Sequence, residues 1–192
     1  ILDPKYAKAH RNGDIHIHDL DFLTLTTTCC QIDLDKLFSG GFSTGHGFLR
    51  EPNDIASYSA LACIAIQSNQ NDQHGGQSIP NFDYALAKGV AKTYARVYRQ
   101  NLGRALELLA GESDGDTAAR KLTEEAKAAS GSRPKLEDGE AYMQAEMQLL
   151  TQRYGEDIAQ KAQHFAYKHA ESETDRATYQ AMEALVHNLN TM

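Results

Sequence analysis

Hydrophobic residues recur every three or four positions in the middle of the chain, between residues 82 and about 109. This spacing places them on one face of an amphipathic helix, which the polar, glycine-containing residues 111–116 would end. Residues 55–69 are nearly all apolar or small and follow the N-cap candidates Asn53 and Asp54, so they predict a second, buried helix. The residues on the first helix's apolar face are Phe82, Leu86, Val90, Tyr94, Val97 and Leu102.

Shorter elements are predicted before residue 80. Residues 15–28 alternate loosely between polar and apolar and end in a β-branched stretch, which is typical of a strand that leads into Cys29-Cys30. Residues 33–38 predict a short helical turn. Residues 42–47 and 69–80 are polar and contain glycine, which favours loops.

The second half of the chain predicts further helices separated by breaks. A helix is expected over residues 117–129, and the Ser, Gly and Pro residues of 130–134 end it. The pattern is helical again over residues 137–187, with interruptions near Gly155 and at 172–174.

Composition changes near residue 100. Residues 1–100 hold 9 Lys and Arg, 10 Asp and Glu, all three cysteines and five of the eight histidines, which indicates a segment that builds a site. Residues 101–192 hold 10 Lys and Arg against 16 Asp and Glu, which indicates solvated helices. With 192 residues in total, we expect one domain rather than two.

Charge and hydropathy exclude several classes of protein. The chain is 41% hydrophobic and 23% charged, which is typical of a globular protein. Its net charge of −7 argues against a general binder of nucleic acids or anionic membranes. No apolar run reaches the roughly 18–20 residues of a membrane span. We therefore expect a cytoplasmic protein. Its three cysteines are an odd number and two of them are adjacent, so we expect free thiols rather than disulfides. Because the sequence begins at Ile1 without a Met, we also expect it to be a piece of a longer protein.

Two histidines near the start of the chain could bind a metal ion. His16 and His18 lie two positions apart and project to the same face of an extended segment, where Asp19 or Asp21 could complete the ligand set. The alternative is that these residues are hydrogen-bonded polar groups that position a loop.

The cysteines and the glycine loops are the other candidates. A thiol at Cys29 or Cys30 could be a nucleophile or a radical carrier, or a small buried hydrophobe, whereas Cys63 within an apolar helix indicates a structural role. The loops at residues 40–47 and 74–78 lack the Lys and spacing of a nucleotide-binding fingerprint. Their backbone N–H groups could still bind an anion, or the loops could be tight turns beside packed helices.

Several segments together resemble the anaerobic, class III ribonucleoside-triphosphate reductases. The resemblance is dense over residues 1–100 and loose over the helical remainder. The segments are GDIHIHDLDF (13–22), CCQIDL (29–34), GGF (40–42), NQNDQHGGQSI (69–79) and PNFD (80–83).

The resemblance implies a fold, an activity and several partners. The fold would be α/β, with residues 1–192 as the N-terminal, helix-rich part of a ten-stranded glycyl-radical barrel. The activity would be reduction of ribonucleoside triphosphates to 2′-deoxyribonucleoside triphosphates by glycyl and thiyl radical chemistry, with formate as reductant in many members. The implied partners are an iron–sulfur, S-adenosylmethionine-dependent activase, ATP or deoxynucleotide effectors, and a second subunit in a homodimer.

Particular residues correspond to the family's functional positions. Cys29 stands four positions before Asp33-Leu34, as does the family's catalytic cysteine on the first barrel strand, and Cys30 is its neighbour on the other face of that strand. The resemblance assigns substrate binding to His18, Gly75, Gly76 and Ser78. Lys88 and Lys92 could bind the effector, although solvated charges on an amphipathic helix are the alternative.

Parts of the family's pattern have no match in these residues. The missing features are the glycyl-radical motif, the mid-chain cysteine that forms a thiyl radical, and a four-cysteine zinc site. Cys63 does not fit the role of the thiyl cysteine. We therefore assign no metal ligands, expect the radical and the zinc in a missing C-terminal segment, and expect the chain alone to be inactive. The alternatives are a glycyl-radical lyase related to pyruvate formate-lyase, because Cys29 and Cys30 are adjacent, and a non-catalytic metal-binding module built on His16 and His18.

Overall fold

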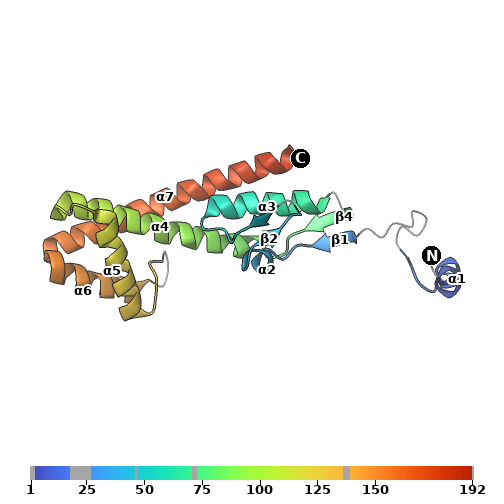
Figure 1. Cartoon of the computed structure of the whole chain (residues 1–192), viewed down its shortest axis with the longest axis horizontal. Helices are drawn as coiled ribbons and strands as arrows, with labels where there is room; N and C mark the ends of the chain where they lie inside the picture. The colour runs from blue at the N-terminus through green and yellow to red at the C-terminus, as the bar shows by residue number, and fades with distance from the viewer. Residues whose placement is uncertain (1–2, 18–26, 46, 71–72, 136–138, 192) are drawn as a thin grey trace.

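The computed structural model describes residues 3–17, 27–45, 47–70, 73–135 and 139–191. These residues form an elongated molecule of seven helices and four short strands (Figure 1). The elements are α1 (Pro4–Asn12), β1 (Thr27–Gln31), α2 (Leu34–Phe38), β2 (Phe42–Ser43), β3 (Phe48–Leu49), α3 (Ile55–Gln70), β4 (Gln73–Ser78), α4 (Phe82–Ala110), α5 (Gly115–Ser130), α6 (Glu140–Tyr154) and α7 (Glu156–Asn190).

Two long helices, α4 and α7, run antiparallel along most of the molecule (Figure 1). At one end they pack with α5 and α6, and towards the other end they pack with α3. Helix α1 lies apart at the far end of Figure 1. The described helices include none with the length and apolar character needed to cross a membrane.

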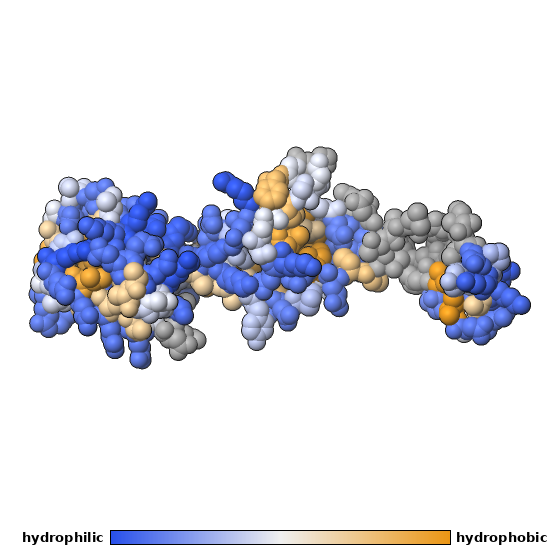
Figure 2. Space-filling view, turned by 60° about the horizontal axis from the view of Figure 1, so that its bottom comes forward, coloured by the Kyte–Doolittle hydropathy of each residue, from blue (hydrophilic) through white to orange (hydrophobic). Residues whose placement is uncertain are grey.

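Each end of the α4–α7 pair has its own hydrophobic core. The first core joins the C-terminal half of α4 to α5, α6 and the start of α7, and the second joins its N-terminal half to α2, α3 and the end of α7. Figure 2 shows a largely hydrophilic surface over the α5–α6 end, with more hydrophobic surface in the middle of the molecule. The large, fully buried side chains include Tyr94, Tyr98, Leu102, Leu106, Leu122, Tyr142 and Leu150 in the first core and Leu34, Phe38 and Ile55 in the second.

Glycines allow close approach where α4 crosses its neighbours. A Cβ atom at Gly103 would lie 2.8 Å from the carbonyl oxygen of Gly115 on α5, and one at Gly89 would lie 2.9 Å from the ring of Tyr58 on α3. Both distances are too short for a real Cβ contact, so a larger residue at either position would push the helices apart.

The strands form two separate pairs. β1 and β4 pair in parallel, and the chain between them passes through α3, while β2 and β3 form a small antiparallel hairpin. A parallel strand pair joined through a helix is the repeating unit of α/β folds. The described residues thus agree with the α/β, helix-rich class; the barrel stays a prediction.

The structure confirms most of the predicted helices and corrects two predictions. The predicted loop at residues 69–80 is wrong, because it contains β4 and the last two residues of α3. The predicted interruption at 172–174 is also wrong, because α7 is continuous there and buries Thr174 completely. The hairpin β2–β3 lies at the edges of the predicted loop at 42–47, and the predicted strand at 15–28 falls largely on residues outside the described ranges.

A buried carboxylate ties three helices together in the first core. Glu146 on α6 has no exposed surface and accepts hydrogen bonds from Tyr98 Oη on α4 at 2.5 Å, Tyr142 Oη at 2.8 Å and Gln163 Nε2 on α7 at 3.0 Å. Burial raises the pKa of Glu146, and the three hydrogen bonds oppose this rise. The side chain therefore acts as a polar clamp within an otherwise apolar core.

Replacing Glu146 with leucine removes this clamp. We expect Glu146→Leu to lower the free energy of unfolding by about 2–4 kcal/mol, because the Tyr142 hydroxyl stays buried without its acceptor, while Tyr98 and Gln163 keep only their contacts to Met143 Sδ and to the Met143 carbonyl oxygen. Urea unfolding followed by circular dichroism measures the loss. Unchanged stability would show that the three donors find other partners.

The matched control, Glu146→Gln, keeps the shape and one acceptor oxygen and should lose only about 1 kcal/mol. It also tests the ionisation. Because the folded chain holds the Glu146 proton more tightly than the unfolded chain, wild-type stability should fall as pH rises from the ordinary pKa of 4.5 through the raised value. Glu146→Gln should remove that part of the pH dependence.

Candidate active site

Cys29 and Cys30 lie in β1, where Cys29 is the middle residue of the strand and faces the glycines of β4. In the parallel register, Thr28 is paired with His74 and Cys30 with Gln77, so Gly75 and Gly76 both face Cys29. This is a β-bulge, in which two residues of one strand oppose one of the other. The sequence therefore folds the cysteine pair and the two predicted substrate-binding glycines into one local structure.

The bulge holds Cys29 in an uncommon backbone conformation. Cys29 has φ +36°, in the left-handed region that non-glycine residues rarely adopt, and Gly75 has φ +110°. The Cys29 side chain is exposed, and its Sγ lies only 3.0 Å from the position that a Cβ on Gly75 would occupy. Such strain is often found at functional sites, and here it presents a thiol to solvent.

Cys30 is half-buried and contacts a group of carboxamides, which we call the amide cluster: Asn69, Gln73 and Gln77. The Cys30 thiol donates to Gln73 Oε1 at 3.0 Å, and Asn69 Nδ2, at the end of α3, donates to Cys30 Sγ at 2.9 Å. Asn69 Nδ2 also donates to Gln77 Oε1 at 3.0 Å and to Gln73 Oε1. The two adjacent cysteines thus have different surroundings.

The amide cluster was missed by the sequence analysis. Its signal was the run of Asn and Gln residues in NQNDQHGGQS, which reads as a polar loop when taken alone. Only the pairing of β1 with β4 reveals that these side chains converge on a thiol.

The other predicted site residues are partly placed. Ser78 is exposed at the end of β4, and its carbonyl oxygen accepts a hydrogen bond from Ile32 N at 2.8 Å. His18 lies outside the described residues. Cys63 is 4% exposed within α3, and burial raises the pKa of its thiol, which supports its structural role.

The described residues contain no cluster of three or more His, Cys, Asp or Glu side chains that could hold a metal ion. His16 is exposed, and its ring centroid lies 5.6 Å from that of His10. His10 Nδ1 accepts a hydrogen bond from Ile17 N at 3.0 Å, so it takes part in positioning this loop.

The two predicted effector-binding lysines form ion pairs with the chain's own carboxylates. Lys88 Nζ lies 3.0 Å from Asp35 Oδ1. Lys92 Nζ lies 2.6 Å from Glu51 Oε1 and donates to the carbonyl oxygen of Pro52 at 2.9 Å. The hydrogen bond from Lys92 lowers the pKa of Glu51.

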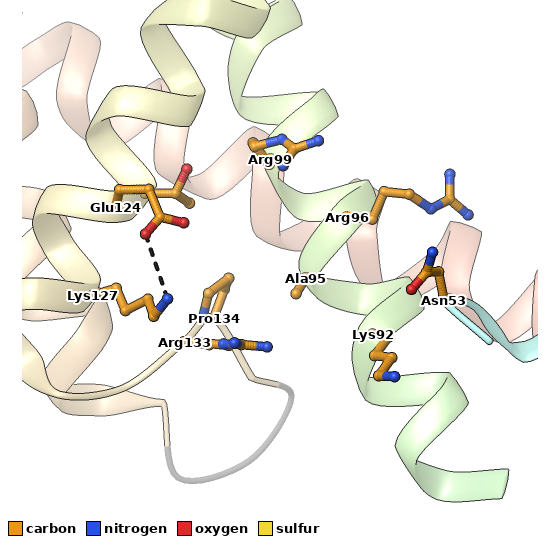
Figure 3. A pocket seen from close by; sticks show the side chains of 10 residues that line it. Asn53, Lys92, Ala95, Arg96, Arg99, Glu124, Lys127, Arg133 and Pro134 are labelled. Carbon is orange, nitrogen blue, oxygen red and sulfur yellow. Dashed lines mark hydrogen bonds and ion pairs between the residues drawn. The ribbon is translucent and has the colours of Figure 1, made fainter. Parts of the chain in front are cut away.

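Lys92 also lines a basic cavity of about 550 Å³ between α4 and α5, which we call the α4–α5 pocket. Figure 3 shows α4 along one side of it, with α5 and the segment that follows α5 across from it. Among the described residues that line it, the basic ones are Lys92, Arg96, Arg99, Lys127 and Arg133, and Glu124 is acidic.

Four of these five cations have a carboxylate nearby, at different distances. Lys92 Nζ lies 2.6 Å from Glu51 and Lys127 Nζ lies 3.4 Å from Glu124 Oε2, while Arg96 and Arg99 lie 3.8 Å from Asp54 and 3.9 Å from Asp116. The last two distances are too long for good hydrogen bonds. In a chain with a net charge of −7, this is a local site suited to an anion.

Comparison with known proteins gives a consistent result. The whole chain, residues 1–192, matches a family model described as anaerobic ribonucleoside-triphosphate reductase. The anaerobic ribonucleoside-triphosphate reductase of Enterobacteria phage T4 is 33% identical over 91 residues, which cover 46% of this chain and 15% of the relative.

Two bacterial relatives have the same name. Those of Salmonella typhimurium and Escherichia coli are each 31% identical over 96 residues, which cover 49% of this chain and 14% of the relative. The matched half of the chain thus covers only about one seventh of the length of each of these two relatives.

The bulge geometry predicts that the two adjacent glycines differ in their tolerance of a side chain. Gly75→Ala should lower the free energy of unfolding by about 1–2 kcal/mol, because its φ is positive and the new Cβ would press on Cys29. Gly76→Ala is the matched control, since its φ is not positive and no atom lies within 4 Å of its added Cβ. Urea unfolding compares the two, and equal losses would contradict the bulge.

Proposed function

Since the chain belongs to the anaerobic ribonucleoside-triphosphate reductase family, we propose that it is part of an enzyme that reduces ribonucleoside triphosphates to 2′-deoxyribonucleoside triphosphates. The observation that carries this proposal is the exposed Cys29 thiol, held in the middle of β1 by the bulge in the pairing with β4. In this proposal β1 and β4 are two parallel strands of the α/β barrel, and the fragment alone does not turn over.

Cys29 would take part in reducing the 2′ position of the ribose. Its S–H bond can release a hydrogen atom to a substrate radical, after which the sulfur needs an electron and a proton from the reductant, which we propose is formate. Its exposure leaves the thiol accessible to a substrate on the open side of the bulge. Backbone groups of Gly75 and Gly76, with Ser78 and His18, would bind that substrate.

The remainder of the polypeptide would supply what these residues lack. We propose that it carries the glycyl radical, the cysteine that forms a thiyl radical and a zinc site. An iron–sulfur, S-adenosylmethionine-dependent activase would generate the radical. The complete enzyme would be a cytoplasmic homodimer that serves deoxyribonucleotide synthesis for DNA replication.

The α4–α5 pocket is our candidate for the effector site. Five cationic side chains around about 550 Å³ suit the triphosphate of ATP or of a deoxynucleotide, since Arg and Lys bind phosphate oxygens through charge-assisted hydrogen bonds. Lys92 lines the pocket and would contact the phosphates. Lys88 lies one turn earlier on α4 and would meet only a part of the ligand that extends beyond the pocket.

The two cysteines should differ in their importance for activity. In the complete, activated enzyme, we expect Cys29→Ala to abolish deoxynucleotide formation while the glycyl radical, measured by electron paramagnetic resonance, still forms. Cys30→Ala should be milder, and Cys63→Ala serves as a control at a buried position. Activity of Cys29→Ala equal to that of the wild type would remove Cys29 from the mechanism.

The effector proposal predicts a loss of nucleotide affinity on charge removal. Arg96→Ala and Lys127→Ala, on opposite walls of the pocket, should each weaken binding of a deoxynucleoside triphosphate about tenfold, which corresponds to one lost charge-assisted hydrogen bond. Isothermal titration calorimetry on the complete protein measures this affinity. Arg104→Ala is the control, because Arg104 lies on α4, pairs with Glu173 and does not line the pocket. Equal affinity in all variants would exclude the pocket.

A further inference from the structure

One side chain of the amide cluster contacts both Cys30 and the bulge. Gln73 Nε2 donates hydrogen bonds to the carbonyl oxygens of Gly75 at 3.0 Å and of Gly76 at 2.7 Å. Its Oε1 accepts from the Cys30 thiol at 3.0 Å and also from Asn69 Nδ2. Both the oxygen and the nitrogen of the Gln73 carboxamide are therefore hydrogen-bonded. They link Cys30 to Gly75 and Gly76, the two glycines that face Cys29.

We propose that Gln73 is a positioning residue for the Cys29 thiol: it fixes the glycine bulge against which that thiol rests. This inference rests on the catalytic role proposed for Cys29. Gln73 itself would not touch the substrate, and it would act through the conformation of Gly75 and Gly76.

The bulge needs such support for two physical reasons. Glycine has more backbone freedom than any other residue, so two consecutive glycines order poorly unless something holds their peptide groups. A bulge also interrupts the regular hydrogen bonds between strands, which would otherwise fix those groups. The Gln73 carboxamide donates to both carbonyl groups and so replaces the missing strand contacts.

Because Gly75 lies against Cys29, a fixed Gly75 backbone also fixes the position of the Cys29 thiol. The backbone N of Cys29 lies 3.2 Å, and its Sγ 3.0 Å, from the position of a Cβ on Gly75, so the two residues are packed without a gap. A shift of the Gly75 peptide by a few tenths of an ångström would change where Cys29 Sγ lies. Catalysis depends on position at this scale, because a misplacement of about 1 Å can cost about a hundredfold in rate.

The chain offers a matched control in Gln77. This residue belongs to the same strand and the same cluster, and its Oε1 also accepts from Asn69. Its Nε2, however, donates to the carbonyl oxygen of Ile66 on α3 at 3.2 Å and not to the bulge. A comparison of Gln73 variants with Gln77 variants therefore distinguishes support of the bulge from general packing of β4 on α3.

The test compares Gln73→Glu with Gln77→Glu in the complete enzyme. Gln73→Glu keeps the side-chain length and the acceptor for Cys30, but it replaces the donor group with an oxygen that the two carbonyls repel. We expect its kcat to fall at least tenfold with the glycyl-radical content unchanged, and its KM for the ribonucleotide to rise, because Gly75 and Gly76 would also bind the substrate. Gln77→Glu should stay within about twofold of the wild type in kcat.

A second measurement does not need turnover. Hydrogen exchange at the amides of Gly75 and Gly76 should speed up at least tenfold in Gln73→Glu and change little in Gln77→Glu. Gln73→Met, which keeps length but donates nothing, should behave like Gln73→Glu and replaces it if that variant does not fold.

The outcomes separate this inference from the proposed function. If the wild-type enzyme makes no deoxynucleotide, the proposed function fails, while hydrogen exchange still tests the hold of Gln73 on the bulge. If exchange and kcat change equally in the Gln73 and Gln77 variants, or in neither, Gln73 has no specific positioning role. A fall in radical content in step with kcat would also overturn the inference, because it would indicate general destabilisation.

Discussion

The parallel pairing of β1 with β4 is the constraint on which the candidate active site depends. It joins Thr27–Gln31 to Gln73–Ser78, two segments separated by the short helix α2, a hairpin and the 16-residue helix α3, and it contains the bulge opposite Cys29. Each feature of the site follows from this pairing. It turns Gly75 towards the Cys29 thiol, brings Gln73 to Cys30, and places Asn69 at the end of α3 beside both.

Polar clamps support the structure at both ends of the α4–α7 pair. At the α5–α6 end, the buried Glu146 takes three hydrogen bonds from three helices. At the other end, the amide cluster holds β4 against α3 and β1. A fully buried polar group such as Glu146 adds specificity only when its partners are present, because an unpaired one costs about 1–3 kcal/mol, whereas the amide cluster is partly buried. The first clamp ties α4, α6 and α7 together, and the second contacts Cys30 and the bulge opposite Cys29.

The sequence was sufficient for elements whose signal is local. The apolar spacing after Phe82 predicted α4 nearly to its observed end, and the small, apolar residues 55–69 predicted α3. The sequence pattern did not predict β4. Gln73, Gly75 and Gly76 have low strand propensity, and they are ordered by pairing with β1, which is far away in the chain. The sequence also failed at residues 172–174, where Thr174 is completely buried in the continuous helix α7 and tertiary packing outweighs a weak local signal. The resemblance led to Cys29 and the glycines, but the α4–α5 pocket draws on residues from 53 to 134, which only the fold brings together.

The most direct test of the central claim is the activity of the complete protein without oxygen. The protein would be activated by its activase and supplied with formate and CTP or ATP, and deoxynucleotide would be measured. Our account predicts deoxynucleotide formation. A glycyl radical without any deoxynucleotide would contradict it and favour a glycyl-radical lyase, and the absence of both would leave only the family relationship.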